Sequence, residues 1–246
     1  MDERRMGFFH RLLNGRQRNT TSASISSSGD LRTEARQRSL SKEIQSKDPW
    51  EQLLGTSTYM IFDTETTGFD YRKDYMFSIG GVKLSEIGEI IQTFYSLIRI
   101  PDEIEIDPMF LQYSHITRED VRMAPSVCQV LHDFFQFSGD SIWVAHHARH
   151  DVNFLNKAVR QCWKTQLDTR VLDTDRVGRL LYPTTAFVML EDWLNNYQIP
   201  IKGRHHALED SKMTAKLWHI FLQELIQKDI QTLGDLYEEI MLHSYT

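Results

Sequence analysis

Three short segments contain side chains whose types and spacing could carry out metal-assisted hydrolysis. The first, FDTETTG, places Asp63 and Glu65 two residues apart at the end of an apolar run. In a strand, side chains at i and i+2 point to the same face. Two carboxylates about 4 Å apart repel by roughly 4 kcal/mol at an effective dielectric of 20, and bound cations would offset that cost. Taken alone, the pattern is more simply an acidic strand end that faces water.

The second segment, VAHHARHD, has three histidines (146, 147 and 150) in the five residues before Asp151. Asp151 opens a predicted helix directly after a predicted strand, at the sheet edge where open α/β sheets bind ligands. By itself it is more simply interpreted as a helix N-cap or as a first-turn acid that the helix dipole stabilises. His146 and His150 lie four residues apart, which admits a zinc site. If the helix begins only near Asp151, that spacing has no helical meaning.

The third segment, GRHHALED, combines two histidines with Asp210. His206 and Asp210 are at i and i+4 on a predicted helix, whereas His205 lies just before it. Helical spacing therefore favours His206 as the functional partner of Asp210. A helix start with two solvated histidines is the alternative.

The elements that must position these side chains begin near residue 59. Apolar runs predict an antiparallel meander of three strands, followed by alternating helices and strands. This order indicates an α/β fold with a sheet of mixed direction. Strands are predicted at 58–63, 77–84, 90–100, 141–147 and 169–174, and helices at 118–137, 151–163, 174–181, 187–197, 206–227 and 230–243.

Residues 1–58 are predicted to be an appendage, and residues 59–246 a separate domain. Residues 4–13 form a possible amphipathic helix for docking, with a membrane-surface or polymerase contact as weaker alternatives. Residues 19–29 are a Ser/Thr-rich linker, and a short helix is expected after Asp48. The formal net charge is −6, which divides into +3 for residues 1–58 and −9 for the rest. Because a passive nucleic-acid-binding module is usually basic, the acidic body argues against that class.

Composition and cysteine content narrow the class of protein further. The chain is 41% hydrophobic and 25% charged, as in soluble globular proteins. No apolar run approaches the roughly 20 residues that cross a bilayer, so no membrane span is predicted. A secretory signal is not expected either. Cys128 and Cys162 are predicted to be separate buried thiols in a reducing cytoplasm.

FDTETTG, VAHHARHD and HHALED occur in the order and approximate spacing of the three motifs of the DEDDh family of 3′–5′ exonucleases. That family includes the proofreading exonuclease subunit of bacterial replicative polymerases. The resemblance covers residues 58–226, with support from GGVKL in the second strand, SHIT at 114–117 and FVMLEDWLNNYQIPI. It implies a ribonuclease H-like fold, with a five-stranded mixed sheet flanked by helices. It also implies removal of single nucleotides from a 3′ end with two divalent cations, Mg²⁺ or Mn²⁺.

The resemblance also assigns residues. The four metal-binding carboxylates would be Asp63, Glu65, Asp151 and Asp210. The family's general base lies five residues before the last aspartate, which is His205, and this overrules the spacing argument for His206. Near the 3′-terminal nucleotide it places Thr66, Phe69 and His146.

The chain departs from the family pattern at three positions. His147 stands where an asparagine is usual, His150 where an aromatic ring is usual, and Ser78 where a glutamate is frequent. No metal ligand is lost, so these departures bear on substrate contacts. Independently of the family, we expect phosphate contacts from Arg149, Arg204 and Lys212, because an acidic body needs local positive charge.

The predicted function is a cytoplasmic, metal-dependent 3′–5′ exonuclease that releases nucleoside monophosphates from DNA. Its expected partners are single-stranded or frayed 3′ ends of DNA and a DNA polymerase. The alternatives are an exoribonuclease acting on RNA, a histidine-ligated metallophosphoesterase, and a non-catalytic polymerase-associated adaptor. The adaptor is disfavoured because a scaffold has no physical need for a repulsive cluster of carboxylates.

Overall fold

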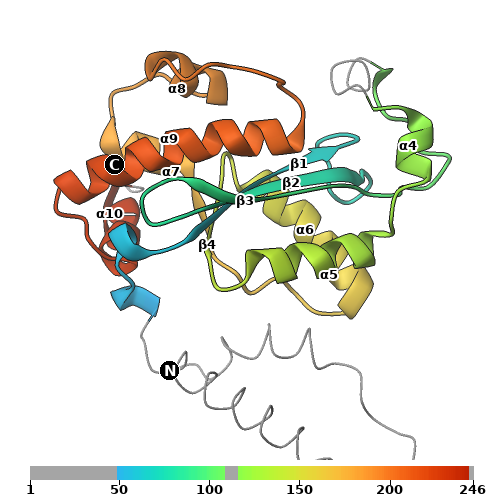
Figure 1. Ribbon diagram of the computed structural model, residues 1–246, viewed down its shortest axis with the longest axis horizontal. Helices are drawn as coiled ribbons and strands as arrows, with labels where there is room; N and C mark the ends of the chain where they lie inside the picture. The colour runs from blue at the N-terminus through green and yellow to red at the C-terminus, as the bar shows by residue number, and fades with distance from the viewer. Residues whose placement is uncertain (1–48, 109–115, 244–246) are drawn as a thin grey trace, which may run out of the picture.

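A five-stranded mixed sheet organises the residues that the computed structural model describes, 49–108 and 116–243 (Figure 1). Its strand order is β3-β2-β1-β4-β5. β1 pairs antiparallel with β2, and β2 antiparallel with β3, whereas β4 runs parallel to both β1 and β5. The strands are β1 (Tyr59–Thr66), β2 (Met76–Leu84), β3 (Ile90–Leu97), β4 (Ile142–Ala145) and β5 (Val171–Asp173). The predicted meander and the mixed sheet are therefore confirmed.

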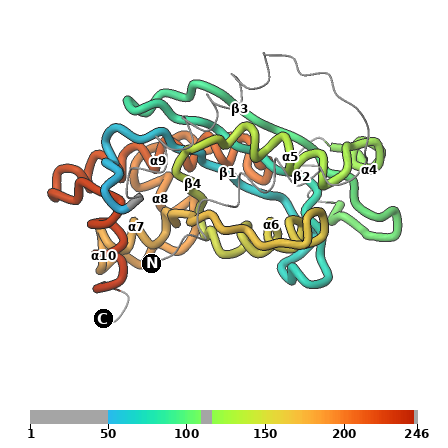
Figure 2. Tube along the Cα trace, turned by 90° about the horizontal axis from the view of Figure 1, so that it is seen from below, coloured from blue at the N-terminus to red at the C-terminus, as the bar shows by residue number. Residues whose placement is uncertain are grey.

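Helices cover both faces of this sheet (Figures 1 and 2). One face packs against α9, with α7, α8 and α10 on the same side, and the other packs against α5 and α6. Two 3₁₀ turns, η1 (Pro49–Glu51) and η2 (Leu54–Thr56), precede β1. The helices are α4 (Arg118–Arg122), α5 (Val127–Ser138), α6 (Arg149–Trp163), α7 (Thr174–Leu181), α8 (Leu190–Asn196), α9 (Ala207–Gln227) and α10 (Leu233–His243).

The central strand β1 is buried on both faces, so its apolar residues divide between two cores. Tyr59 and Ile61 belong to the core under α9, whereas Met60 and Phe62 belong to the core under α5 and α6. This alternation is the period of two of a β-strand. It fixes the faces toward which the residues at the end of β1 point.

The helical pattern at 118–137 is interrupted, and the prediction of one continuous helix there was wrong. α4 ends at Arg122, and α5 begins at Val127 after an N-cap at Ser126. Pro125 lies in the interruption, and proline disfavours helical backbone in the residue before it. The predicted N-cap at Thr117 is confirmed, because its side chain and that of Asp120 form a capping box.

Residues 49–56 pack against the C-terminal helix. The ring of Trp50 lies 5.5 Å from that of Tyr237, and the Arg170 guanidinium lies 3.9 Å above the Trp50 ring. The short helix predicted after Asp48 is replaced by the two 3₁₀ turns. The predicted helix at 4–13 and the linker at 19–29 lie outside the described residues, and the domain boundary at residue 58 stays a prediction.

The prediction of two separate thiols was wrong, because Cys128 and Cys162 form a disulfide. Cys128 is on α5 and Cys162 on α6; these helices pack side by side, so their Cα atoms lie 5.4 Å apart. The cysteines thus give no support to a reducing compartment. Within the described residues, no helix has the length and apolar character needed to cross a membrane.

Candidate active site

Asp63 and Glu65 lie at the end of β1 and point toward α9. They share the face of Tyr59 and Ile61, since all four are odd-numbered residues of one strand. Opposite Asp63 in the register is Gly80 of β2. A Cβ atom at Gly80 would lie 2.3 Å from the backbone nitrogen of Leu208. Only glycine therefore lets the first turn of α9 approach the sheet this closely.

That close approach brings the third carboxylate to the first two. Asp210 lies in the first turn of α9 and is buried. One carboxylate oxygen each from Asp63, Glu65 and Asp210 lie within 4.8 Å of one another. The structure thus joins the first and third predicted motifs, which are separated by 145 residues, into one acidic cluster.

Asp151 approaches this cluster from the other face of the sheet, and its charge raises the pKa of Asp63 and Glu65, but it is not one of the residues whose ligand atoms lie within 4.8 Å of one another. It lies in the first turn of α6, is buried, and accepts hydrogen bonds from Thr64. The Thr64 backbone nitrogen is 3.0 Å from Asp151 Oδ1, and the hydroxyl is 2.6 Å from the same oxygen. Thr64 stands between Asp63 and Glu65 but points to the opposite face. Thr64 was not predicted to have this role, although strand alternation indicates the face toward which its side chain points.

Burial raises the pKa of all four carboxyl groups, and repulsion by the other carboxylates adds to it at Asp63 and Glu65. Burial, together with the other three carboxylates, raises the pKa of Asp63 well above its usual range. Burial and the charges of Asp210 and Asp151 raise the pKa of Glu65 to about 9. Burial raises the pKa of Asp151 to about 7, against the hydrogen bonds from Thr64. The cluster therefore needs positive charge to be fully ionised at neutral pH.

The donor set fits hard divalent cations. Glu65 Oε1 and Asp210 Oδ1 are buried and have no hydrogen-bond partner among the described residues. Unpartnered buried carboxylate oxygens are costly unless they bind a cation or a proton. Oxygen-only ligands suit Mg²⁺ or Mn²⁺ better than zinc. The three histidines of VAHHARHD do not belong to the cluster of metal-ligating atoms found among the described residues.

The two histidines before α9 have different environments. His206 is the N-cap residue of α9, and its ring stacks on Tyr95 with a centroid distance of 4.4 Å. His205 is exposed and has a left-handed backbone with φ of 62°. Its backbone nitrogen donates to Asp210 Oδ2 at 3.1 Å. The stacked ring is held against β3, whereas the exposed ring lies on the loop beside the cluster.

The predicted substrate residues lie at the ends of β1 and β4. The Thr66 hydroxyl donates to the Gly68 carbonyl and lies 3.2 Å from His150 Nε2. Phe69 is 94% exposed, and its ring meets the edge of the His150 ring at 6.0 Å. The ring of His150 also packs on that of Phe154 at 4.9 Å, so it contacts the aromatic rings of both Phe69 and Phe154.

His146 is held with one nitrogen free to meet a ligand. Its Nδ1 lies 2.8 Å from the Thr174 hydroxyl, and its buried Nε2 has no hydrogen-bond partner among the described residues. Burial lowers the pKa of His146 to about 3, so its ring is neutral at pH 7. His147 stacks on this ring at 4.4 Å, and its backbone nitrogen donates to Asp173 Oδ1. The Nε2 of His147 lies 3.8 Å from Asp175 Oδ1. His147, which stands where the family usually has an asparagine, is thus held by Asp175 while its ring packs on that of His146.

Two of the three predicted phosphate contacts, Lys212 and Arg204, pair with carboxylates. Lys212 pairs with Glu209 at 2.7 Å, and Arg149 is exposed at the start of α6. Arg204 Nε lies 2.7 Å from Glu191 Oε1, and its Nη1 forms an ion pair with Asp210. Nothing in the sequence pattern indicated that Glu191, on α8, would contact this loop.

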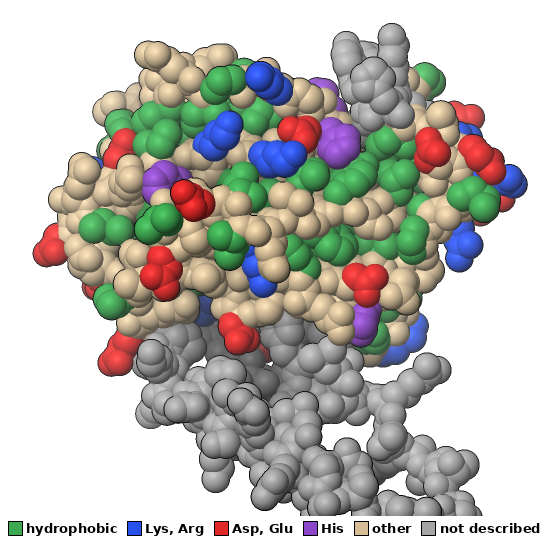
Figure 3. Space-filling view, viewed as in Figure 1, with side chains coloured by type: hydrophobic (Ala, Val, Ile, Leu, Met, Phe, Trp, Pro, Cys, Tyr) green, Lys and Arg blue, Asp and Glu red, His purple; other side chains and the backbone are tan. Residues whose placement is uncertain are grey.

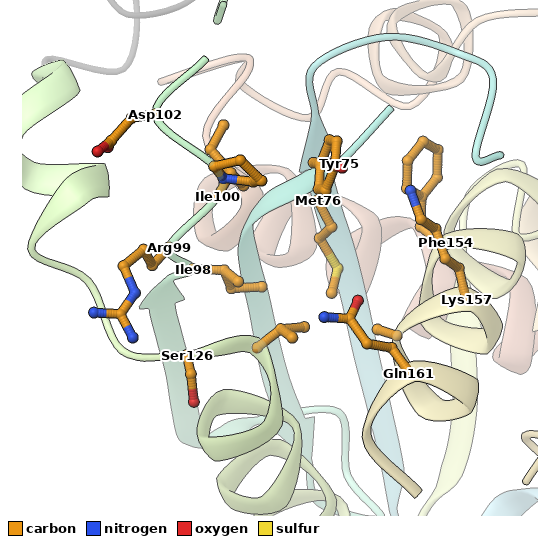
Figure 4. A pocket seen from close by; sticks show the side chains of 13 residues that line it. Tyr75, Met76, Ile98, Arg99, Ile100, Asp102, Ser126, Phe154, Lys157 and Gln161 are labelled. Atoms are coloured by element: carbon orange, nitrogen blue, oxygen red, sulfur yellow. The ribbon is translucent and has the colours of Figure 1, made fainter. Parts of the chain in front are cut away.

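A pocket of about 410 Å³ lies on the α5 and α6 side of the sheet (Figure 4). Its walls include Met76, Ile98 and Phe154, with Lys157 and Gln161 of α6 also lining it. None of the predicted site residues lines this pocket. On the face seen in Figure 3, basic and acidic side chains are interspersed, so positive charge is not gathered into one patch on that face.

Known proteins resemble this chain in sequence and in fold. Residues 60–218 match the exonuclease family RNase_T. A PolC-type DNA polymerase III of Clostridium perfringens is 33% identical over 183 residues, which cover 73% of this chain and 12% of that protein. The 3′-5′ exonuclease DinG of Staphylococcus epidermidis is 30% identical over 184 residues, which cover 75% of this chain and 20% of that protein. This chain thus spans at most a fifth of the length of these two relatives.

Two solved structures support the fold. A 3′-exonuclease that recognises a histone mRNA stem-loop aligns with a TM-score of 0.60 at 16% identity. That alignment covers 82% of this chain and 76% of the other. Exonuclease I aligns with a TM-score of 0.56 at 15% identity, over 70% of this chain and 43% of the other. The predicted ribonuclease H-like architecture is therefore confirmed.

Proposed function

Because this chain belongs to the RNase_T exonuclease family and is a nuclease of the 3′–5′ DEDDh type, we propose that it releases nucleoside monophosphates one at a time from the 3′ end of DNA. One observation carries the proposal. Three carboxylates from two motifs, of which Glu65 and Asp210 are buried, converge within 4.8 Å, and two of their oxygens have no partner among the described residues. Such a cluster is favourable when cations bind to it.

The four carboxylates would hold two divalent cations, Mg²⁺ or Mn²⁺. When bound, such cations supply a water of lowered pKa and stabilise charge on the leaving 3′ oxygen. Asp63, Glu65 and Asp210 present ligand oxygens from the α9 face of β1. Asp151 presents the remaining carboxylate, which Thr64 fixes through two hydrogen bonds.

His205 would accept the proton of the attacking water. Its exposed position on the loop before α9 leaves the ring accessible to water, and its backbone is tied to Asp210. The oxygen of water would bond to phosphorus, the bond to the 3′ oxygen would break, and the 5′-mononucleotide would leave. Thr66, Phe69 and the Nε2 of His146, which has no partner in the described part of the chain, would position the terminal nucleotide.

DNA is the proposed substrate because the PolC-type relative is a DNA polymerase. The same relative supports a proposed contact with a polymerase. The acidic body argues for local contacts at a 3′ end and against binding along a duplex through a broad basic surface. We also propose that the protein acts in the cytoplasm, because it would meet a DNA substrate and a DNA polymerase there; the Cys128–Cys162 disulfide would then be of a kind that is rare in a reducing compartment.

The test is digestion of single- and double-stranded DNA and RNA labelled at the 3′ or 5′ end. We expect stepwise release from the 3′ end of DNA with Mg²⁺ or Mn²⁺ and none with EDTA. Asp63→Asn and Asp210→Asn should lower the rate at least about 10³-fold while the protein stays folded. Full activity in either variant would refute the site, and faster release from RNA would refute the choice of substrate.

A further inference from the structure

Arg204 places a positive charge directly beside the acidic cluster, because its guanidinium pairs with Asp210. Its side chain is 22% exposed and joins Glu191 on one side to Asp210 on the other. Asp210 is only 5% exposed at its side chain. An arginine with two carboxylate partners at this depth carries a permanent charge, because guanidinium does not lose its proton in proteins.

This charge partly neutralises the cluster. The Arg204 guanidinium pairs with Asp210, and a carboxylate oxygen of Asp210 lies within 4.8 Å of one from Asp63 and one from Glu65. Arg204 therefore gives the carboxylates part of the stabilisation that bound divalent cations would give them. A cation that binds beside Asp210 would also be repelled by the guanidinium at short range.

The two roles compete for the same oxygen. Asp210 Oδ2 accepts from the His205 backbone and pairs with Arg204, whereas Oδ1 has no partner among the described residues. A cation bound by both oxygens would have to displace the guanidinium. Glu191 offers a place for it, because Oε1 already binds Arg204 and Oε2 is buried with no partner among the described residues. A guanidinium can bind both oxygens of one carboxylate through parallel N–H groups.

The loop around Arg204 is bracketed by two left-handed residues, Gly203 with φ of 61° and His205 with φ of 62°. Asp210 holds the side chain of Arg204 and the backbone of His205 at once. A change in the contacts of Asp210 would therefore also affect His205, the residue that we propose as the general base.

We propose that Arg204 is a built-in counter-ion that holds Asp210 while divalent cations are absent and moves fully onto Glu191 when they bind. This inference rests on the proposed function for the nature of the cations. In thermodynamic terms, the Arg204–Asp210 pair and the bound cation exclude each other, and Glu191 shifts that balance toward the cation. Arg204 is thus a positioning residue. Its guanidinium pairs with Asp210 when no cation is bound and with Glu191 alone when cations are bound.

The test is titration of the full chain with Mn²⁺ in a calorimeter, which measures cation affinity without catalysis. Arg204→Gln removes the competitor and should tighten Mn²⁺ binding about tenfold, within the usual range of coupling between sites. Glu191→Gln removes the place to which Arg204 moves and should weaken binding at least about threefold. The double variant should resemble Arg204→Gln. Circular dichroism shows whether each variant is folded, and the rise in Tm on adding Mn²⁺ gives a second measure of affinity.

Lys202→Gln is the matched control, because it removes one positive charge from an exposed residue of the same loop. Equal tightening in Lys202→Gln and Arg204→Gln would overturn the proposal, since net charge alone would then explain it. Unchanged or weaker binding in Arg204→Gln, or tighter binding in Glu191→Gln, would also overturn it. If the wild-type protein bound no Mn²⁺, the proposed function would fall as well, which separates the two failures.

Discussion

At the scale of single residues, the site is built by alternation along one strand. Asp63 and Glu65 point toward α9, and Thr64 between them points toward α6 and binds Asp151. Three consecutive residues thus connect acids from two helices on opposite faces of the sheet. β2 pairs with β1 at all three of these positions, whereas β4 pairs with β1 only at Tyr59–Ile61, so the ladder with β2 holds this part of the backbone.

The two histidines before α9 provide a test at this scale. His205→Ala should lower kcat about 10²- to 10⁴-fold, because loss of a general base has effects of that size. His206→Ala should lower it far less and cost about 1 kcal/mol of stability, since this ring stacks on Tyr95. Steady-state kinetics and denaturant unfolding of both variants check the ranking. A larger loss of kcat in His206→Ala would assign the base to the helix instead.

At the scale of elements, the distance between β2 and α9 decides whether the acids meet. Gly80→Ala would place a methyl group 2.3 Å from backbone of α9, which cannot yield as a side-chain end can. We expect a loss of about 3 kcal/mol in stability, at the upper end for overpacking, and a loss of most activity. Gly81→Ala is the control, because its nearest contacts are at 3.4 Å or more. If both variants unfold at the same denaturant concentration as wild type, this packing does not position Asp210.

The disulfide between α5 and α6 gives a second prediction for the elements. It links residues 34 apart, so the loop-closure estimate of its stabilisation is about 3–4 kcal/mol. Dithiothreitol should lower the unfolding free energy by that order, and the Cys128→Ser, Cys162→Ser double variant should match the reduced protein. Exonuclease activity should persist at 25 °C, because Thr64 holds Asp151 at the opposite end of α6. A reduced protein as stable as the oxidised one would contradict the estimate.

Elements were easier to predict from the sequence than contacts between them. Strand alternation and helical periodicity are local, so the five strands and most helices could be predicted, whereas the break near Pro125 required proline to outweigh a continuous apolar pattern. The family resemblance supplied His205, which helical spacing had passed over. The Cys128–Cys162 bond and the Glu191–Arg204 pair could not be predicted, because each joins distant segments without a local signal.

At the scale of the whole molecule, residues 59–246 carry a formal net charge of −9 and also contain the cluster of carboxylates. The described part of the chain concentrates its least favourable charges at one end of the sheet, where burial raises the pKa of Asp63, Glu65, Asp151 and Asp210. Natural proteins keep such unfavourable clusters at functional sites and offset them elsewhere. Here the apolar side chains buried in the two cores on either side of β1 stabilise the fold and so offset the cost of the carboxylate cluster.

The last prediction concerns the pH dependence of stability with and without cations. The pKa of Glu65 is raised to about 9 and that of Asp151 to about 7, against about 4 when unfolded. Between those values the folded state binds more protons, so in EDTA the Tm should fall as pH rises from about 5 to 9. Cations bind the ionised carboxylates, so the rise in Tm on adding Mg²⁺ or Mn²⁺ should grow over the same range. Differential scanning calorimetry measures both, and Glu65→Gln should flatten the fall in EDTA. A Tm in EDTA that rises steadily to pH 9 would show that these carboxyl groups are already ionised without a cation.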